Sequence, residues 1–212
     1  MTVNSGTVKL GLYSSFIAFM AIAGYGAAQI LQVAGLVTYP LDAILIYGFS
    51  LLIPIPFVLA LLALHYSVPR EKKIWTHAAL LFAAIYTAYV TLNYVVQLAT
   101  VIPMTLRGAL GEVRVLDQTP HSLFWDVDAL GYIFMGIATF FAAFAFTAQG
   151  LEKWVRCLFL ANALVTPVIA FVYFYPTFSM SLLILGSPWL VTASGSMALL
   201  ARFFMRKQAE AG

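Results

Sequence analysis

Six long apolar runs dominate this sequence and leave few folds open to it. They cover about residues 11–36, 41–65, 75–102, 122–147, 157–175 and 182–204. About 20 apolar residues suffice for an α-helix to cross the hydrocarbon core of a bilayer, so each run is long enough to span. None of the runs alternates apolar and polar residues with a period of two, which excludes a β-barrel. We therefore expect an all-α fold, a polytopic membrane bundle of six transmembrane helices.

The composition supports the same class of protein. Hydrophobic residues make up 63% of the chain and charged residues only 9%, with a mean hydropathy of +0.95. So few charged side chains cannot cover the surface of a soluble protein. Six spans use most of the 212 residues, which leaves short connections and no room for a separate soluble domain. Residues 1–212 are therefore expected to form one transmembrane domain.

Charged residues separate by sign between the two ends of the predicted helices. Five of the eight acidic residues lie at the same ends as Arg107 and Arg114, whereas the other nine basic residues lie at the opposite ends: Lys9, Arg70, Lys72, Lys73, Lys153, Arg156, Arg202, Arg206 and Lys207. Cytoplasmic connections of membrane proteins are enriched in Lys and Arg. We therefore predict a multi-pass protein of the cell membrane with both termini in the cytoplasm. Nucleic-acid binding is excluded, because no basic face is present.

The longest connection, residues 103–119, then lies outside the cytoplasm. Leu106, Leu110 and Val113 recur in it at helical spacing beside charged residues. This pattern suits a short amphipathic helix on the membrane surface. Gly108 and Gly111 weaken any helix here, so a solvated loop is the alternative.

Polar residues inside the spans indicate which helix faces point inward, because polar side chains are costly in contact with lipid. The clearest stripe lies on residues 75–102, where steps of three and four join Tyr86, Tyr89, Asn93, Gln97 and Thr100. We expect this stripe to face the interior of the bundle.

Other helices carry polar groups at the same depth. Trp125, Asp128 and Tyr132 share one face of the fourth span, whereas Asp126 points elsewhere. The sequence therefore predicts an outward-facing polar pocket in the outer leaflet, with these ligand-binding residues: Gln29, Gln32, Tyr89, Asn93, Gln97, Trp125, Asp128 and Tyr132. The alternative is that the amides join helices to one another and that the carboxylates stabilise a helix N-terminus.

No cofactor or metal is expected. One cysteine and three histidines give no cluster with metal-site spacing. His65 and His77 fall at the cytoplasmic ends of their spans, which argues against a haem held between helices. The remaining catalytic candidates are Asp128 and His121, an acid–base pair near the outer surface.

Prolines and tryptophans complete the sequence-based expectations. Interruptions of the helices are predicted at Pro54 with Pro56, at Pro167 and at Pro188, since proline lacks a backbone N–H. The four tryptophans lie near predicted span ends, as in the aromatic belt of membrane proteins: Trp75, Trp125, Trp154 and Trp189.

Three functions are compatible with these features. The first is binding or transport of a small amphiphilic or lipid-like molecule, with Asn93 and Gln97 forming hydrogen bonds and Asp128 supplying charge. The second is an intramembrane enzyme that modifies a lipid or isoprenoid with Asp128 as acid or base. The third is a structural or accessory subunit whose polar stripes only join helices.

Overall fold

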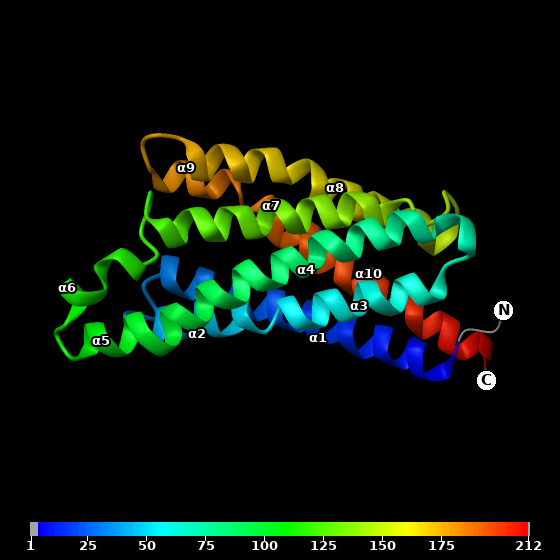
Figure 1. Ribbon diagram of the computed structural model, residues 1–212, viewed down its shortest axis with the longest axis horizontal. Coiled ribbons are helices and arrows are strands. Elements are labelled where there is room, and N and C mark those ends of the chain that lie inside the picture. Colours follow the sequence, from blue (N-terminus) through cyan, green and yellow to red (C-terminus); the bar gives the residue numbers. More distant parts are fainter. Residues whose placement is uncertain (1–3, 212) are drawn as a thin grey trace.

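The computed structural model describes residues 4–211, and that part of the chain is helical without any strand (Figure 1). Within it, six helical segments are long and apolar enough to cross a membrane: Ser5–Val33, Leu41–Ser67, Arg70–Leu106, Leu123–Ala143, Gly150–Phe174 and Met180–Glu210. The predicted all-α class is confirmed, and so is the number of helical segments that are long and apolar enough to span a membrane.

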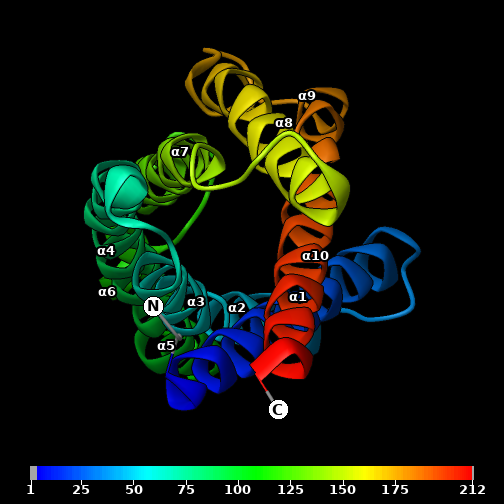
Figure 2. The same ribbon diagram turned by 90° about the vertical axis from the view of Figure 1, so that its right-hand side faces the viewer.

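The helices form a closed ring in chain order, and neighbours run in opposite directions (Figure 2). The last helix packs against the first and closes the ring, and both termini lie at the same end of it. The members of the ring are α1 (Ser5–Val33), α2 and α3 (Leu41–Leu51 and Pro54–Ser67), α4 (Lys73–Val96), α7 (Leu123–Ala143), α8 (Gly150–Phe174) and α10 (Pro188–Ala211).

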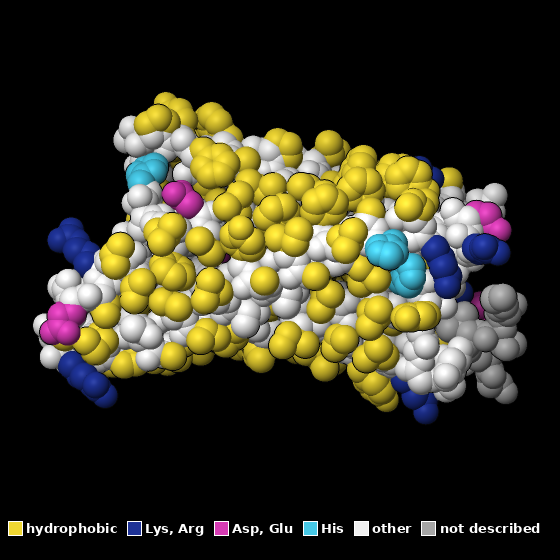
Figure 3. All heavy atoms as spheres, in the orientation of Figure 1, with side chains coloured by type: hydrophobic (Ala, Val, Ile, Leu, Met, Phe, Trp, Pro, Cys, Tyr) yellow, Lys and Arg dark blue, Asp and Glu magenta, His cyan; other side chains and the backbone are white. Residues whose placement is uncertain are grey.

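Charged side chains lie at the two ends of the ring and leave a broad apolar belt between them (Figure 3). The basic turn η1 (Arg70–Lys72) joins α3 to α4 at the end that carries the termini. Arg107 and Arg114 lie at the other end, beyond α4. The separation of charge seen in the sequence is thus retained in the fold.

Two of the three predicted interruptions are present. The second span breaks between α2 and α3 just before Pro54, and the last span breaks between α9 (Met180–Leu185) and α10, which begins at Pro188. The interruption expected at Pro167 is wrong, because α8 continues through that residue. There the hydroxyl of Thr166 donates a hydrogen bond of 3.3 Å to the carbonyl of Asn162.

The third span extends further than the sequence indicated. At its end α4 widens into a π-helical turn, η2 (Gln97–Val101), and continues as α5 (Ile102–Leu106). Pro103 has no N–H to donate to the carbonyl of Ala99, and the N–H of Ile102 bonds instead to the carbonyl of Gln97. The predicted end of this span at residue 102 was therefore four residues too early.

The connection after α5 contains two short turns, α6 (Leu110–Val113) and η3 (Arg114–Leu116), which follow one another directly. The expectation of one amphipathic helix is wrong, because Gly108 takes a positive φ of 76° and ends the helical path that Leu106 belongs to. Val113 is buried against the bundle. This connection folds back over the end of the ring.

Near the termini the interior of the ring is solid. Fully buried aromatic and aliphatic side chains fill it, among them Phe57, Phe159, Phe204, Leu64 and Met197. Phe146 makes edge-to-face contacts with Phe159 and Phe203, at ring-centroid distances of 5.6 and 5.4 Å. Dense packing of this kind fills the interior of this half of the bundle.

Close packing between α7 and α8 depends on a glycine. A Cβ added at Gly136 would overlap the side chain of Thr166 on α8, whereas a Cβ at Gly48 on α2 would meet nothing within 4 Å. Both glycines lie inside α-helices. The two positions therefore differ in the space beside them and not in secondary structure.

We expect Gly136→Ala to lower the free energy of unfolding by about 1–3 kcal/mol, because forced overpacking shifts the neighbouring helix. Gly48→Ala is the control and should leave stability unchanged or slightly raised, since alanine favours helix over glycine. Thermal unfolding in detergent compares the two variants. Equal stability of both would contradict the close contact between α7 and α8.

Candidate ligand-binding site

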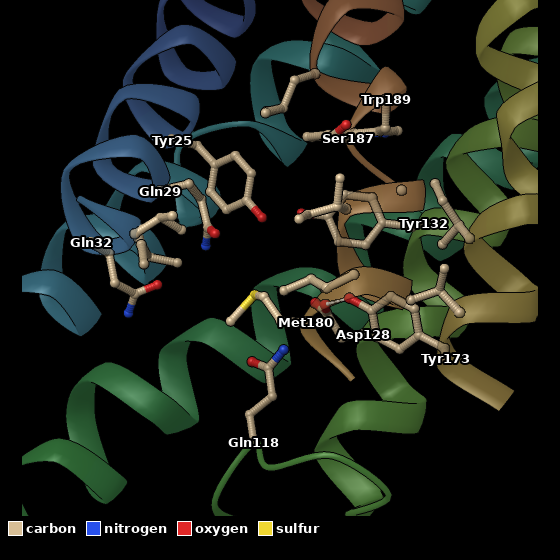
Figure 4. A pocket seen from close by; sticks show the side chains of 18 of the residues that line it. Tyr25, Gln29, Gln32, Gln118, Asp128, Tyr132, Tyr173, Met180, Ser187 and Trp189 are labelled. Carbon is tan, nitrogen blue, oxygen red and sulfur yellow. Dashed lines mark hydrogen bonds between the residues drawn. The ribbon is translucent and has the colours of Figure 1, made fainter. Parts of the chain in front are cut away.

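A cavity of about 590 Å³ lies inside the ring, toward the end opposite the termini (Figure 4). Side chains from α1, α2, α4, α7, α8, α9 and α10 line it, and Gln118 from the connection before α7 reaches it. The volume falls within the range of about 300–1,000 Å³ that is typical of small-molecule sites.

Aromatic side chains form much of the cavity wall. The ring of Trp189 packs edge-to-face against Tyr132 and Tyr25, at centroid distances of 4.9 and 5.9 Å. The other aromatic lining residues are Tyr47, Tyr94, Trp125 and Tyr173. The indole N–H of Trp189 is buried without a hydrogen-bond partner among the described residues.

Among the described lining residues, Asp128 is the only acidic one. It is 2% exposed and accepts two hydrogen bonds from neutral donors. The Nδ2 of Asn93 lies 2.9 Å from its Oδ1, and the hydroxyl of Tyr173 lies 2.7 Å from its Oδ2. No Lys, Arg or His is among the lining residues, so the structure places no cationic partner beside this carboxyl group.

The amide of Asn93 ties three elements together. Its Nδ2 donates to Asp128 on α7 and also, over 3.0 Å, to the Oε1 of Gln118. Because both partners are acceptors, only one orientation of this amide satisfies them. Asn93 therefore holds Asp128 and the connection before α7 in fixed positions relative to α4.

Gln97 anchors the same connection one turn further along. Its Nε2 donates to the carbonyl of Leu116 over 2.8 Å, and its Oε1 accepts from the backbone N–H of Gln118 over 3.2 Å. The inward orientation expected for Asn93 and Gln97 is confirmed, since both are fully buried. Neither residue lines the cavity, and both instead form hydrogen bonds with residues that do.

The exposed side chains of the cavity wall are mostly apolar and mark its mouth. Several lining side chains are largely exposed: Ile30 and Val33 near the end of α1, at 68% and 73%, and Ile184 on α9, at 62%. Met180, at the start of α9, is also exposed and lines the cavity. An opening between such side chains suits contact with hydrocarbon better than contact with water.

The structure brings together five of the eight predicted ligand-binding residues in the cavity wall: Gln29, Gln32, Trp125, Asp128 and Tyr132. Asn93, Gln97 and Tyr89 do not line the cavity. Tyr89 is half-buried, and its ring packs against that of Phe134 at a centroid distance of 5.8 Å. Gln32 also donates to Asp42 on α2 over 2.8 Å.

His121 does not join Asp128 in the cavity. It lies exposed in the turn before α7, with a positive φ of 65°, and is not among the lining residues. The expected acid–base pair is therefore not assembled in this structure.

Several lining residues were not identified from the sequence. Tyr173 and Trp189 are the main ones, because Trp189 was attributed to the aromatic belt. That interpretation is wrong for Trp125 and Trp189, which are buried in the cavity wall, whereas Trp75 and Trp154 are exposed. Helical spacing could have identified Tyr173, because it lies on the same face of α8 as Ile169 and both residues line the cavity.

No family model, curated protein or solved structure matches this chain. Its function is therefore argued from the cavity alone.

We expect Gln97→Leu to lower the free energy of unfolding by about 1–3 kcal/mol, because the Leu116 carbonyl and the Gln118 N–H lose their partner. Gln149→Leu is the matched control, since Gln149 is exposed and makes no capping bond with its side chain. Thermal unfolding in detergent measures both. If the two variants were equally stable, Gln97 would not anchor the connection.

Proposed function

We propose that this protein is an integral membrane protein that binds a small amphiphilic or lipid-like molecule in an outward-facing pocket of the outer leaflet. The observation that carries the proposal is the cavity itself, which combines an apolar mouth with one buried carboxyl group on its wall. An amphiphile has the matching combination of an apolar tail and a polar head.

The orientation in the membrane is part of the proposal. The end that holds the termini carries nine of the eleven basic residues, among them Arg70 and Lys72 of the turn η1, and only Arg107 and Arg114 lie at the opposite end. An excess of Lys and Arg favours the cytoplasmic side. The cavity, at the opposite end, then lies in the outer leaflet of the cell membrane.

The shape of the interior favours binding over passage across the membrane. The half of the ring near the termini is filled by side chains such as Phe57, Phe159 and Phe204. A molecule in the cavity would exchange through the mouth between α1 and α9, within one leaflet.

The other two functions have less support. The acid–base pair expected for an intramembrane enzyme would need His121 beside Asp128, and His121 is exposed and outside the cavity. A purely structural subunit would use Asp128 only to join helices. The bond from Asn93 fits that role, but a cavity of about 590 Å³ beside the same carboxyl group serves no joining purpose.

Cysteine labelling tests the orientation. Glu71 and Glu112 are exposed at opposite ends of the ring, and Cys157 is the one native cysteine. In a Cys157→Ser background, we expect an impermeant thiol reagent added to intact cells to label Glu112→Cys and not Glu71→Cys. Inverted vesicles should give the opposite pattern. Labelling of Glu71→Cys alone in intact cells would reverse the topology.

Fluorescence quenching by lipid tests the pocket. With Trp75→Phe and Trp154→Phe, only Trp125 and Trp189 in the cavity wall remain. In nanodiscs of dibrominated phosphatidylcholine we expect their fluorescence to fall well below that in unbrominated lipid, because bromine quenches on contact and acyl chains enter the mouth. The reverse pair of substitutions, Trp125→Phe with Trp189→Phe, leaves the exposed Trp75 and Trp154. This variant is the positive control for quenching.

Two neighbouring substitutions make this test specific. Ala43 lines the cavity and Ile44 does not, although the two are adjacent on α2. Ala43→Phe should narrow the cavity and reduce the quenching of Trp125 and Trp189, whereas Ile44→Phe should leave it unchanged. Absence of quenching in the parent protein would show that lipid chains do not enter, and the pocket proposal would fail.

A further inference from the structure

We infer that the head of the bound amphiphile is an organic cation, an ammonium group held between Asp128 and the aromatic wall of the cavity. This inference rests on the proposed function and adds the chemical class of the ligand to it. The observation that carries it is a buried carboxyl group in a ligand cavity that contains no positive charge.

The hydrogen bonds at Asp128 suit an ionised carboxylate. Each of its two oxygens accepts a bond, one from the amide of Asn93 and one from the hydroxyl of Tyr173. A carboxylate accepts in this way. Both donors are neutral, so the described lining residues would not balance a negative charge on this group.

In its ionised form this carboxyl group would carry an unbalanced charge at a depth where charge is costly. Charged side chains within membrane-spanning helices usually pair with an opposite charge or mark a pathway for a ligand or ion. Asp128 is 2% exposed, which limits compensation by bulk water. A cationic head entering the cavity would supply the missing charge at the surface of the carboxylate.

The cavity wall is also suited to a cation. Tyrosine and tryptophan rings attract ammonium groups through the negative faces of their π-systems, and this attraction is stronger where water is excluded. Tyr25, Tyr132 and Trp189 pack edge-to-face around one side of the cavity. Figure 4 shows Tyr25 and Tyr132 extending into the same space as Asp128.

The same features disfavour anionic heads. A phosphate or carboxylate would need a Lys, Arg or His on the wall, and the described lining residues include none. Arg107 and Arg114 lie exposed on the connection at this end and do not line the cavity. An anion would instead meet Asp128 and be repelled.

The arrangement places the two parts of the ligand. Its ammonium head would lie beside Asp128, and its apolar tail would leave between Ile30 and Val33 on one side and Ile184 on the other. The tail then extends into the hydrocarbon of the outer leaflet.

Three amphiphiles of equal chain length test the charge of the head: octyltrimethylammonium, N,N-dimethyloctylamine N-oxide and octyl sulfate. The amine oxide resembles the ammonium compound in shape but carries no net charge. Isothermal titration of the protein in phosphatidylcholine nanodiscs, with empty nanodiscs subtracted for partitioning, gives the three affinities. We expect the ammonium compound to bind at least about tenfold more tightly than the amine oxide, and the sulfate to bind most weakly.

Asp128→Asn keeps the size of the side chain and removes its charge. This variant should lose the preference for the ammonium compound, by about tenfold or more, and keep its affinity for the amine oxide within about threefold. If the variant does not fold, the comparison of the three amphiphiles on the unmodified protein decides alone.

Two results would overturn the inference. One is equal or tighter binding of the amine oxide or the sulfate to the unmodified protein. The other is a preference for the ammonium compound that persists in Asp128→Asn. In either case, quenching of Trp125 and Trp189 by brominated lipid would still support a pocket for amphiphiles. If none of the three compounds binds and brominated lipid does not quench, the inference and the proposed function both fail.

Discussion

The hydrogen bond between Asn93 and Asp128 is the interaction on which the half of this structure opposite the termini depends. It joins α4 to α7 between two buried side chains, and the same amide holds Gln118 of the connecting segment. One turn further along, Gln97 anchors that segment by its backbone. The polar stripe of α4 thus serves as a support that fixes a carboxyl group at the edge of a cavity.

The two halves of the ring differ in how they use aromatic residues. Near the termini, phenylalanines interlock and exclude space, as around Phe146. In the other half the aromatic residues are mostly tyrosine and tryptophan, which combine large rings with polar atoms and line a cavity of about 590 Å³. The breaks before Pro54 and Pro188 lie between these regions. One half filled by side chains and one half with a cavity support the proposal that the protein binds a molecule from one leaflet.

The sequence was informative where a physical rule acts on one helix at a time. Apolar length predicted the six spans, and helical phase predicted the burial of Asn93, Gln97 and Asp128. It was less informative where the outcome depends on packing between helices. Trp189 lies near a span end, and this position does not show whether its ring turns outward to the membrane interface or inward to the cavity. It was therefore attributed to the membrane interface. Similarly, Pro167 is accommodated within α8, which no local rule about proline reveals.

The central claim is that the cavity beside Asp128 holds an amphiphile that enters between α1 and α9. Its most direct test is an experimental structure of the protein in lipid nanodiscs, at a resolution that shows bound lipid. We expect elongated density for a bound amphiphile, with the head of the molecule next to Asp128 and Trp189 and its tail leaving the cavity past Ile30 and Ile184. A cavity closed by inward movement of these side chains, or occupied by ordered water alone, would contradict it.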